Sequence, residues 1–302
     1  MAGTQLTTAQ SVDNLIPLCG IRFLTSRDMT AVTTNTPAEP TSHPLDRFAV
    51  VGKSAVITGA SGALGAGIAE TLGAMGAKLT LASGSAELLD DLARRITEAG
   101  GVAQTINRRP NGAEDAEAIV ERAVGAFGSV DLLVVASGFN QAGFIHEQDL
   151  ADWETVMDAN VRGAWLMAQA FGKRALEQGT GGKVLLISSV RGRHGNYSGY
   201  TAYCTSKGAT DALTRSLATE WAQYGITVNA IAPTLFRSGV TAWMFGDDEL
   251  GRATRERSLA RIPLGRLGEV DDLLGMAIYL LSPASDFCTG QVMYVDGGYT
   301  AG

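Results

Sequence analysis

From about residue 48 to the C-terminus, two kinds of apolar segment alternate along the chain. Short runs rich in β-branched residues or apolar throughout predict strands at 54–59 (SAVITG), 78–83 (KLTLAS), 102–107 and 130–138 (VDLLVVASG). Between them, segments with apolar residues three and four positions apart predict amphipathic helices, as at 85–100 and 113–128. The run at 130–138 suits a strand that is buried on both faces of a parallel sheet.

The alternation continues beyond residue 150. Helices are predicted near 150–178, 201–224 and 270–283, and strands at 183–189, 227–233 and 292–298. Strict alternation of strand and helix predicts right-handed crossovers, and therefore an α/β fold with a doubly wound parallel sheet. We see no internal repeat and no sign of a second domain, so residues 47–302 are assigned to a single domain.

Residues 1–46 differ from the rest of the chain. They are rich in Thr, Ser and Pro, carry few charges and lack sustained periodicity, as in TAVTTNTPAEPTSHP at 30–44. We interpret them as a disordered extension. A targeting peptide is disfavoured because the first residues are not basic and arginine is sparse.

The composition indicates which kinds of partner and which cellular compartment to expect. The 302 residues carry a net charge of −7 with no long basic run, which argues against nucleic acid as a partner. The three cysteines, Cys19, Cys204 and Cys288, are odd in number and lack metal-ligand spacing, so we predict a cytoplasmic protein without a metal site. No apolar run is long enough to span a bilayer, so we expect no membrane association.

A glycine-rich turn, TGASGALGAG at 58–67, lies between the first predicted strand and the following helix. In this position glycines let the backbone approach a pyrophosphate, while the helix N-terminus supplies amide donors. Close packing of the strand against the helix is the alternative explanation.

A second motif, HGNYSGYTAYCTSK, opens the helix predicted at 201–224. Of its three tyrosines, only Tyr203 lies four residues before Lys207, a spacing that puts both side chains on one helix face. A fixed ammonium group there predicts a lowered phenol pKa, which suits a proton donor and acceptor. Tyr197 and Tyr200 are expected to shape a pocket.

Together with VDGG at 295–298, these motifs resemble the classical short-chain dehydrogenase/reductase family over residues 48–301. The resemblance implies a Rossmann-type catalytic domain that binds NAD(H) or NADP(H) and interconverts a secondary alcohol and a ketone or aldehyde. The family's T-G-x-x-x-G-x-G turn is matched by Thr58, Gly59 and Gly65. Ala63 replaces its middle glycine, and Gly62 stands one place earlier.

The resemblance also assigns roles to individual residues. Tyr203 is the general acid and base, Lys207 assists it, Ser189 holds the substrate oxygen (with Ser188 as the alternative), and Asn160 supports a water-mediated proton relay. The residues assigned to the cofactor are Gly59, Ser61, Gly62, Leu64, Gly65, Ser83, Ala136, Ser137, Gly138, Tyr203, Lys207, Pro233, Phe236 and Ser238.

The residues around the adenosine half of the cofactor depart from the family pattern. An NAD-preferring member carries an aspartate at the end of the second strand, where this chain has Ser83 and Gly84. Arg108 and Arg109 follow the third strand and can reach a 2′-phosphate. We therefore predict that NADP(H) is preferred over NAD(H).

The substrate loops are expected after Gly138, Ser189 and Pro233. Their candidate substrate contacts are Asn140, His146, Arg191, Tyr197 and Trp243. Arg191 and Arg193 can clamp a carboxylate or phosphate, unless they are merely solvated; this favours a small sugar acid, polyol or oxo acid.

Two alternatives stay open at this point: a 3-oxoacyl-thioester reductase of the same family, and a catalytically reduced dinucleotide sensor. The resemblance further implies a small-molecule substrate and a homotetramer or homodimer.

Overall fold

The computed structural model describes residues 43–246 and 248–302, which contain one seven-stranded parallel sheet. Its strand order is β3-β2-β1-β4-β5-β6-β7, which confirms the predicted doubly wound α/β fold. The strands are β1 (Ser54–Thr58), β2 (Lys78–Ser83), β3 (Val102–Asn107), β4 (Leu132–Val135), β5 (Gly182–Ile187), β6 (Ile226–Pro233) and β7 (Val292–Val295).

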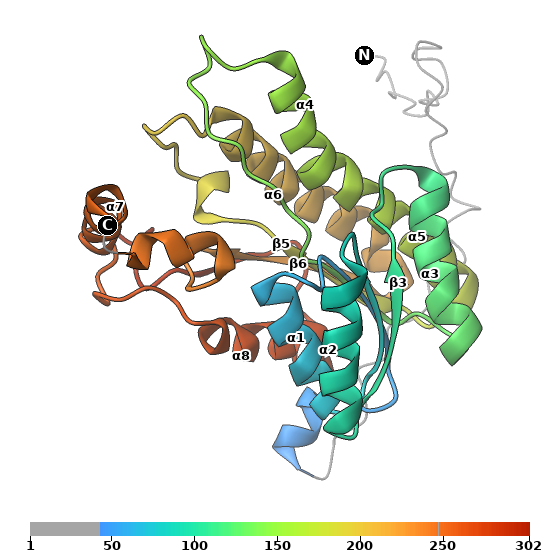
Figure 1. Ribbon diagram of the computed structural model, residues 1–302. Helices are drawn as coiled ribbons and strands as arrows, with labels where there is room; N and C mark the ends of the chain where they lie inside the picture. The colour runs from blue at the N-terminus through green and yellow to red at the C-terminus, as the bar shows by residue number, and fades with distance from the viewer. Residues whose placement is uncertain (1–42, 247) are drawn as a thin grey trace, which may run out of the picture. The chain divides into compact units, whose positions relative to one another are not determined.

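Helices cover both faces of the sheet (Figure 1). One face carries α1 (Ala63–Ala74), α2 (Ala86–Glu98) and α8 (Val270–Leu281), and the other carries α3 (Ala113–Phe127), α5 (Gly163–Gln178) and α6 (Thr201–Trp221). Each layer buries its own apolar core against the strands. Leu72 and Leu79 belong to the first core, and Phe171 and Leu133 to the second. Burial on both faces explains why β4 is apolar throughout.

The helix predicted near 150–178 is not continuous. It consists of α4 (Leu150–Met157), a π-helical turn η4 (Asp158–Arg162) and α5. A single turn with i→i+5 hydrogen bonds is too short for a sequence pattern to reveal, and such turns often lie at functional sites.

Several shorter elements complete the described residues. The last residues of the predicted extension belong to a 3₁₀ turn, η3 (Pro44–Phe48), and residues 1–42 lie outside the described residues. Sequence periodicity does not predict α7 (Glu249–Leu259), because its sequence ELGRATRERSL contains few apolar residues. The other turns are η5 (Val190–Gly192), η6 (Ala222–Tyr224), η7 (Gly239–Phe245) and η8 (Pro283–Ser285).

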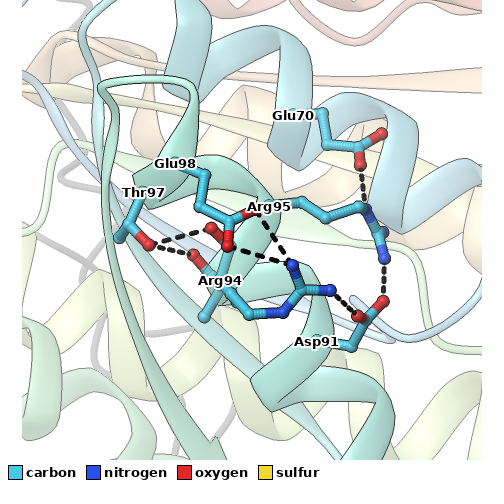
Figure 2. A network of polar contacts seen from close by, with 7 residues as sticks. Glu70, Asp91, Arg94, Arg95, Thr97 and Glu98 are labelled. Atoms are coloured by element: carbon cyan, nitrogen blue, oxygen red, sulfur yellow. Dashed lines mark hydrogen bonds and ion pairs between the residues drawn. The ribbon is translucent and has the colours of Figure 1, made fainter.

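A network of charged side chains links the outer surfaces of α1 and α2 (Figure 2). Arg95 bonds to Glu70 of α1 at 2.8 Å and also to Asp91, while Arg94 bonds to Asp91 and Glu98 within α2. All of these side chains are exposed, so water screens the charges and the network stabilises the fold only weakly.

The sheet topology determines where a ligand can bind. All strands are parallel, so their carboxyl ends meet along one edge, and the strand order reverses between β1 and β4. In open α/β sheets ligands bind in the crevice at this reversal. Among the described residues, no helix combines the length and the apolar character that a membrane crossing requires.

Candidate active site

The glycine turn after β1 is built so tightly that side chains are excluded. Gly59 has a φ of +67°, and a Cβ atom there would lie 2.4 Å from the backbone nitrogen of Ser137. A Cβ atom at Gly65 would lie 2.4 Å from the carbonyl oxygen of Gly59. The N-cap of α1, Gly62, makes no side-chain cap, so amide groups of the first turn stay available to a phosphate. The structure shows the close packing, and binding of a pyrophosphate at this turn stays a prediction.

The other residues assigned to the cofactor lie along the same edge of the sheet. Ser83 ends β2, Ala136 to Gly138 follow β4, and Pro233 ends β6. Phe236 is buried, and its ring lies against Gly268. The hydroxyl of Ser238 lies 3.4 Å from that of Thr241.

Lys207 is the most deeply buried charged side chain of the candidate site, with 4% of its surface exposed. Its Nζ donates a hydrogen bond of 2.8 Å to the carbonyl oxygen of Ile187, at the end of β5. The same atom lies 5.6 Å from the centre of the Tyr203 ring. Burial lowers the pKa of Lys207 to about 8, and the charge of Asp211 opposes this shift.

The predicted direction of the Tyr203 pKa is wrong. Burial raises the pKa of Tyr203 above its ordinary value, while a hydrogen bond with Ser189 and the charge of Arg191 partly offset the increase. The spacing to Lys207 correctly places both groups on one helix face. It does not reveal that the phenol is desolvated, and desolvation disfavours the charged phenolate.

The structure distinguishes the two candidate serines. Ser189 accepts a hydrogen bond of 3.1 Å from the amide of Arg191 and also bonds with Tyr203. Ser188 points the other way and donates its hydroxyl hydrogen to Asp211. Ser189, not Ser188, therefore lies beside the phenol.

Sequence reasoning missed Asp211, four residues after Lys207 on the same helix. Its side chain is buried, and burial raises its pKa, against the hydrogen bond from Ser188. Because Asp211 acts on the Lys207 charge, it belongs to the electrostatic surroundings of the site. The i, i+4 spacing of two opposite charges was the available signal.

Asn160 lies in η4 and holds the loop that follows β4. Its Oδ1 accepts a bond of 2.7 Å from the Phe139 amide, and its Nδ2 donates bonds of 2.8 Å to the Phe139 carbonyl and the Ser206 hydroxyl. Both amide donors are thus used, which leaves only acceptor capacity on the side chain for a water molecule. A Cβ atom at Gly138 would lie 3.5 Å from Oδ1 and 3.6 Å from the Lys207 Nζ, so Asn160 and Lys207 flank the same backbone.

The candidate substrate residues lie on two loops that contact each other. The amide of Gly143 donates a bond of 2.7 Å to the carbonyl of Gly199, which joins the loop after β4 to the loop after β5. Asn140 and His146 are exposed on the first loop, and His146 pairs with Glu147 at 3.5 Å. Tyr197 is 62% exposed on the second. The side chain of Trp243 lies outside the part of the chain that the structure describes.

The two arginines proposed as a clamp do not converge. Arg191 donates a bond of 2.8 Å to the carbonyl of Gly195, and its guanidinium lies 5.6 Å from the Tyr299 ring centre. Arg193 lies over Tyr294, at 5.9 Å, and hydrogen-bonds with it. Of these two arginines, only Arg191 acts on the pKa of Tyr203. Sequence reasoning missed the aromatic partners because both follow the last helix, about a hundred residues away.

Comparisons with known proteins found relatives that cover most of the chain. A protein-family model described as "Enoyl-(Acyl carrier protein) reductase" matches residues 59–300. An uncharacterized oxidoreductase of Mycobacterium tuberculosis is 55% identical over 85% of this chain and 94% of its own length. The 2-dehydro-3-deoxy-D-gluconate 5-dehydrogenase of Escherichia coli is 34% identical over 85% of this chain and 99% of its own. The crystal structure of a gluconate 5-dehydrogenase from Burkholderia cenocepacia, in complex with NADP and tartrate, is 32% identical with a TM-score of 0.80, covering 86% of this chain and 100% of that one.

Proposed function

Because the chain belongs to the classical short-chain dehydrogenase/reductase family, we propose that it interconverts a secondary alcohol and a ketone on a small polar hydroxy acid. The protein is an NAD(P)-dependent oxidoreductase that acts on a small molecule. The proposal adds the substrate class, the cofactor preference and the roles of the residues.

One observation carries the proposal: Ser189 and Lys207, from different elements, meet at the ring of Tyr203. The Ser189 hydroxyl orients the substrate oxygen as charge develops on it. Tyr203 donates or accepts the hydroxyl proton, and Lys207 stabilises the phenolate electrostatically. When bound, the nicotinamide supplies or accepts the hydride.

The raised pKa of Tyr203 agrees with these roles. A phenol whose pKa is raised by burial holds its proton at neutral pH, as a general acid for carbonyl reduction must. Oxidation of an alcohol needs the deprotonated form, so we expect it to be fastest at alkaline pH.

The relatives support a sugar acid as the substrate type. Several of them are dehydrogenases of gluconate or 2-dehydro-3-deoxy-D-gluconate, at 33–34% identity. One structural neighbour is a complex with NADP and tartrate, and tartrate is a hydroxy acid. In this chain, Arg191 provides a positive charge next to Tyr203, where the carboxylate of such a substrate can bind.

NADP(H) is the proposed cofactor, and Arg109 is the residue that favours it. Its guanidinium lies against Gly84 at the end of β2, where a Cβ atom would be 2.2 Å from its Nε. Arg108 is instead paired with Asp115 at 3.3 Å. A 2′-phosphate at the end of β2 would therefore meet Arg109 and no carboxylate of that strand. Three structural neighbours contain NADP.

Isothermal titration with NADPH and NADH tests this preference. Arg109→Gln should weaken NADPH binding about tenfold and leave NADH binding nearly unchanged, since one charge-assisted contact is lost. Arg108→Gln is the matched control and should change both affinities little. Tighter binding of NADH than of NADPH by the wild-type protein would contradict the cofactor assignment.

The reaction itself is tested by absorbance at 340 nm with D-gluconate, related sugar acids and neutral polyols. Tyr203→Phe keeps the ring but removes the proton, so kcat should fall at least about 100-fold while cofactor affinity is retained. Equal rates for the variant and the wild type would exclude Tyr203 as the acid and base.

Two other functions are separated by the same assay. The family-model description and a relative that is a substituted succinyl-CoA dehydrogenase subunit (35% identical over 182 residues) both name an acyl thioester. A 3-oxoacyl-thioester reductase is therefore the second candidate. Turnover of acetoacetyl-CoA, without turnover of sugar acids, would identify it. Cofactor binding without turnover on either panel would indicate a dinucleotide sensor.

We further propose that the protein is a homotetramer or homodimer in the cytoplasm. Trp165 and Leu176 of α5 are exposed large apolar side chains, as at association surfaces. Cys204 and Cys288 are free thiols, which suits a reducing compartment. Light scattering of the purified protein measures the number of chains directly.

A further inference from the structure

Tyr299, near the C-terminus, is surrounded by cationic and polar groups from distant parts of the chain. Its ring is 7% exposed and packs in a small apolar cluster with Val190, Ile262 and Leu267. The guanidinium of Arg261, just after α7, lies 4.4 Å from the ring centre. The guanidinium of Arg191 lies at 5.6 Å, and the ring of His194 meets it edge-on at 6.2 Å.

Two buried polar atoms at this place have no hydrogen-bond partner among the described residues. They are the hydroxyl of Tyr299 and the Nε2 of His194. Burying a polar atom without a partner is unfavourable, and a bound ligand can supply the missing partner. The rings that carry these two atoms pack edge-on, with their centres 6.2 Å apart.

The charges at this place are not neutralised within the described part of the chain. Among the described residues, no ion pair involves Arg191 or Arg261. Arg191 uses one donor on the Gly195 carbonyl, but a guanidinium has five. The Asp296 carboxylate nearby in the sequence is bonded to the amides of Gly298 and Thr300. Two arginines outside any ion pair and two unpartnered polar atoms form a recognition pattern for an anion.

The location relates this pattern to catalysis. Arg191 follows Ser189 by two residues, its amide bonds to the Ser189 hydroxyl, and its charge acts on Tyr203. An anion held by Arg191 would therefore lie close to Ser189 and Tyr203. Arg109, our candidate for the cofactor phosphate, lies instead at the end of β2, on the other side of the central strands.

We propose that the polar side chains around the Tyr299 ring form a subsite for the carboxylate of a small hydroxy-acid substrate. This Tyr299 subsite consists of Arg191, His194, Arg261 and Tyr299. The subsite deepens the proposed function and rests on it, because only that function makes the bound anion a substrate. Binding of the anion can still be measured without turnover. It also explains why two arginines converge on a buried C-terminal tyrosine.

The test is isothermal titration of the protein, saturated with NADP⁺, with tartrate and with threitol, the neutral polyol of the same carbon skeleton. The wild type should bind tartrate more tightly than threitol. Arg261→Gln should weaken tartrate binding about tenfold, and Tyr299→Phe, which keeps the ring and its packing, about fivefold. Threitol binding should change little in both variants.

Arg252→Gln is the matched control, because it removes an exposed positive charge from α7 without a ring contact. It should bind tartrate as the wild type does. If Arg261→Gln does not fold, Tyr299→Phe decides alone. Equal affinity of the wild type for tartrate and threitol, or unchanged tartrate affinity in Tyr299→Phe and Arg261→Gln, overturns the proposal.

Failure of the subsite and failure of the proposed function give different results. Tyr203→Phe should keep tartrate affinity and lose turnover, because it removes only the proton donor. Tartrate binding that depends on Arg261, in a protein that oxidises no alcohol, supports the subsite and refutes the function. Turnover of D-gluconate with an unchanged KM in Arg261→Gln supports the function and refutes the subsite.

Discussion

The buried ammonium group of Lys207 has a cost for folding that can be measured by titration. In the folded protein, burial lowers its pKa from 10.5 to about 8. A change of this size corresponds to about 3 kcal/mol. The folded state is less stable by this amount when Lys207 is charged than when it is neutral. Lys207→Met replaces the ammonium group with an apolar side chain of similar length and removes this penalty.

The sign of the pH dependence follows from proton binding. Below about pH 8 both the folded and the unfolded chain carry the Lys207 proton, so the penalty is fully present. Between about pH 8 and 10.5 the unfolded chain binds more protons, so the free energy of unfolding of the wild type rises with pH relative to Lys207→Met. From about pH 7 to about pH 9.5 we expect the difference between the two proteins to change by about 2 kcal/mol in favour of the wild type.

Urea unfolding of both proteins at several pH values measures this difference, since all other titrating groups are common to the two chains. Lys173→Met serves as the control, because its ammonium is exposed on α5 and pairs with Glu117 at the surface. A difference between wild type and Lys207→Met that stays constant from about pH 7 to about pH 9.5 would refute the reasoning. The variant should also lose turnover, since Tyr203 loses its cationic neighbour.

Two further predictions concern the supports of the site. Gly65→Ala places a Cβ atom 2.4 Å from the Gly59 carbonyl oxygen. It should lower the free energy of unfolding by about 1–3 kcal/mol and weaken cofactor binding. Gly125→Ala, in open space on α3, should do neither. Thermal unfolding with and without NADPH measures both effects. Asn160→Ala leaves the Phe139 amide and carbonyl unpaired, so hydrogen exchange of residues 138–149 should accelerate and kcat should fall; unchanged exchange would show that the loop is held otherwise.

The sequence alone determined the architecture and the positions of the main catalytic candidates. Alternating apolar runs and amphipathic segments depend on neighbours within a few residues, so local periodicity predicts the order of strands and helices. The spacing of Tyr203 and Lys207 is local in the same sense, because helix geometry puts them on one face. The glycines of the first turn mark the place where the backbone must pass closely.

Only the tertiary structure decided which group each candidate faces. Ser188 and Ser189 are adjacent, yet one bonds to Asp211 and the other to Tyr203. Arg108 and Arg109 are adjacent too, but one pairs with Asp115 and the other lies against Gly84.

These choices, the direction of the Tyr203 pKa and the surroundings of Tyr299 share one physical reason. Hydrogen-bond partners and desolvation are set by residues that are far apart in the chain and meet only when the sheet forms. A pattern in the sequence therefore names the chemical groups, and packing determines their environment.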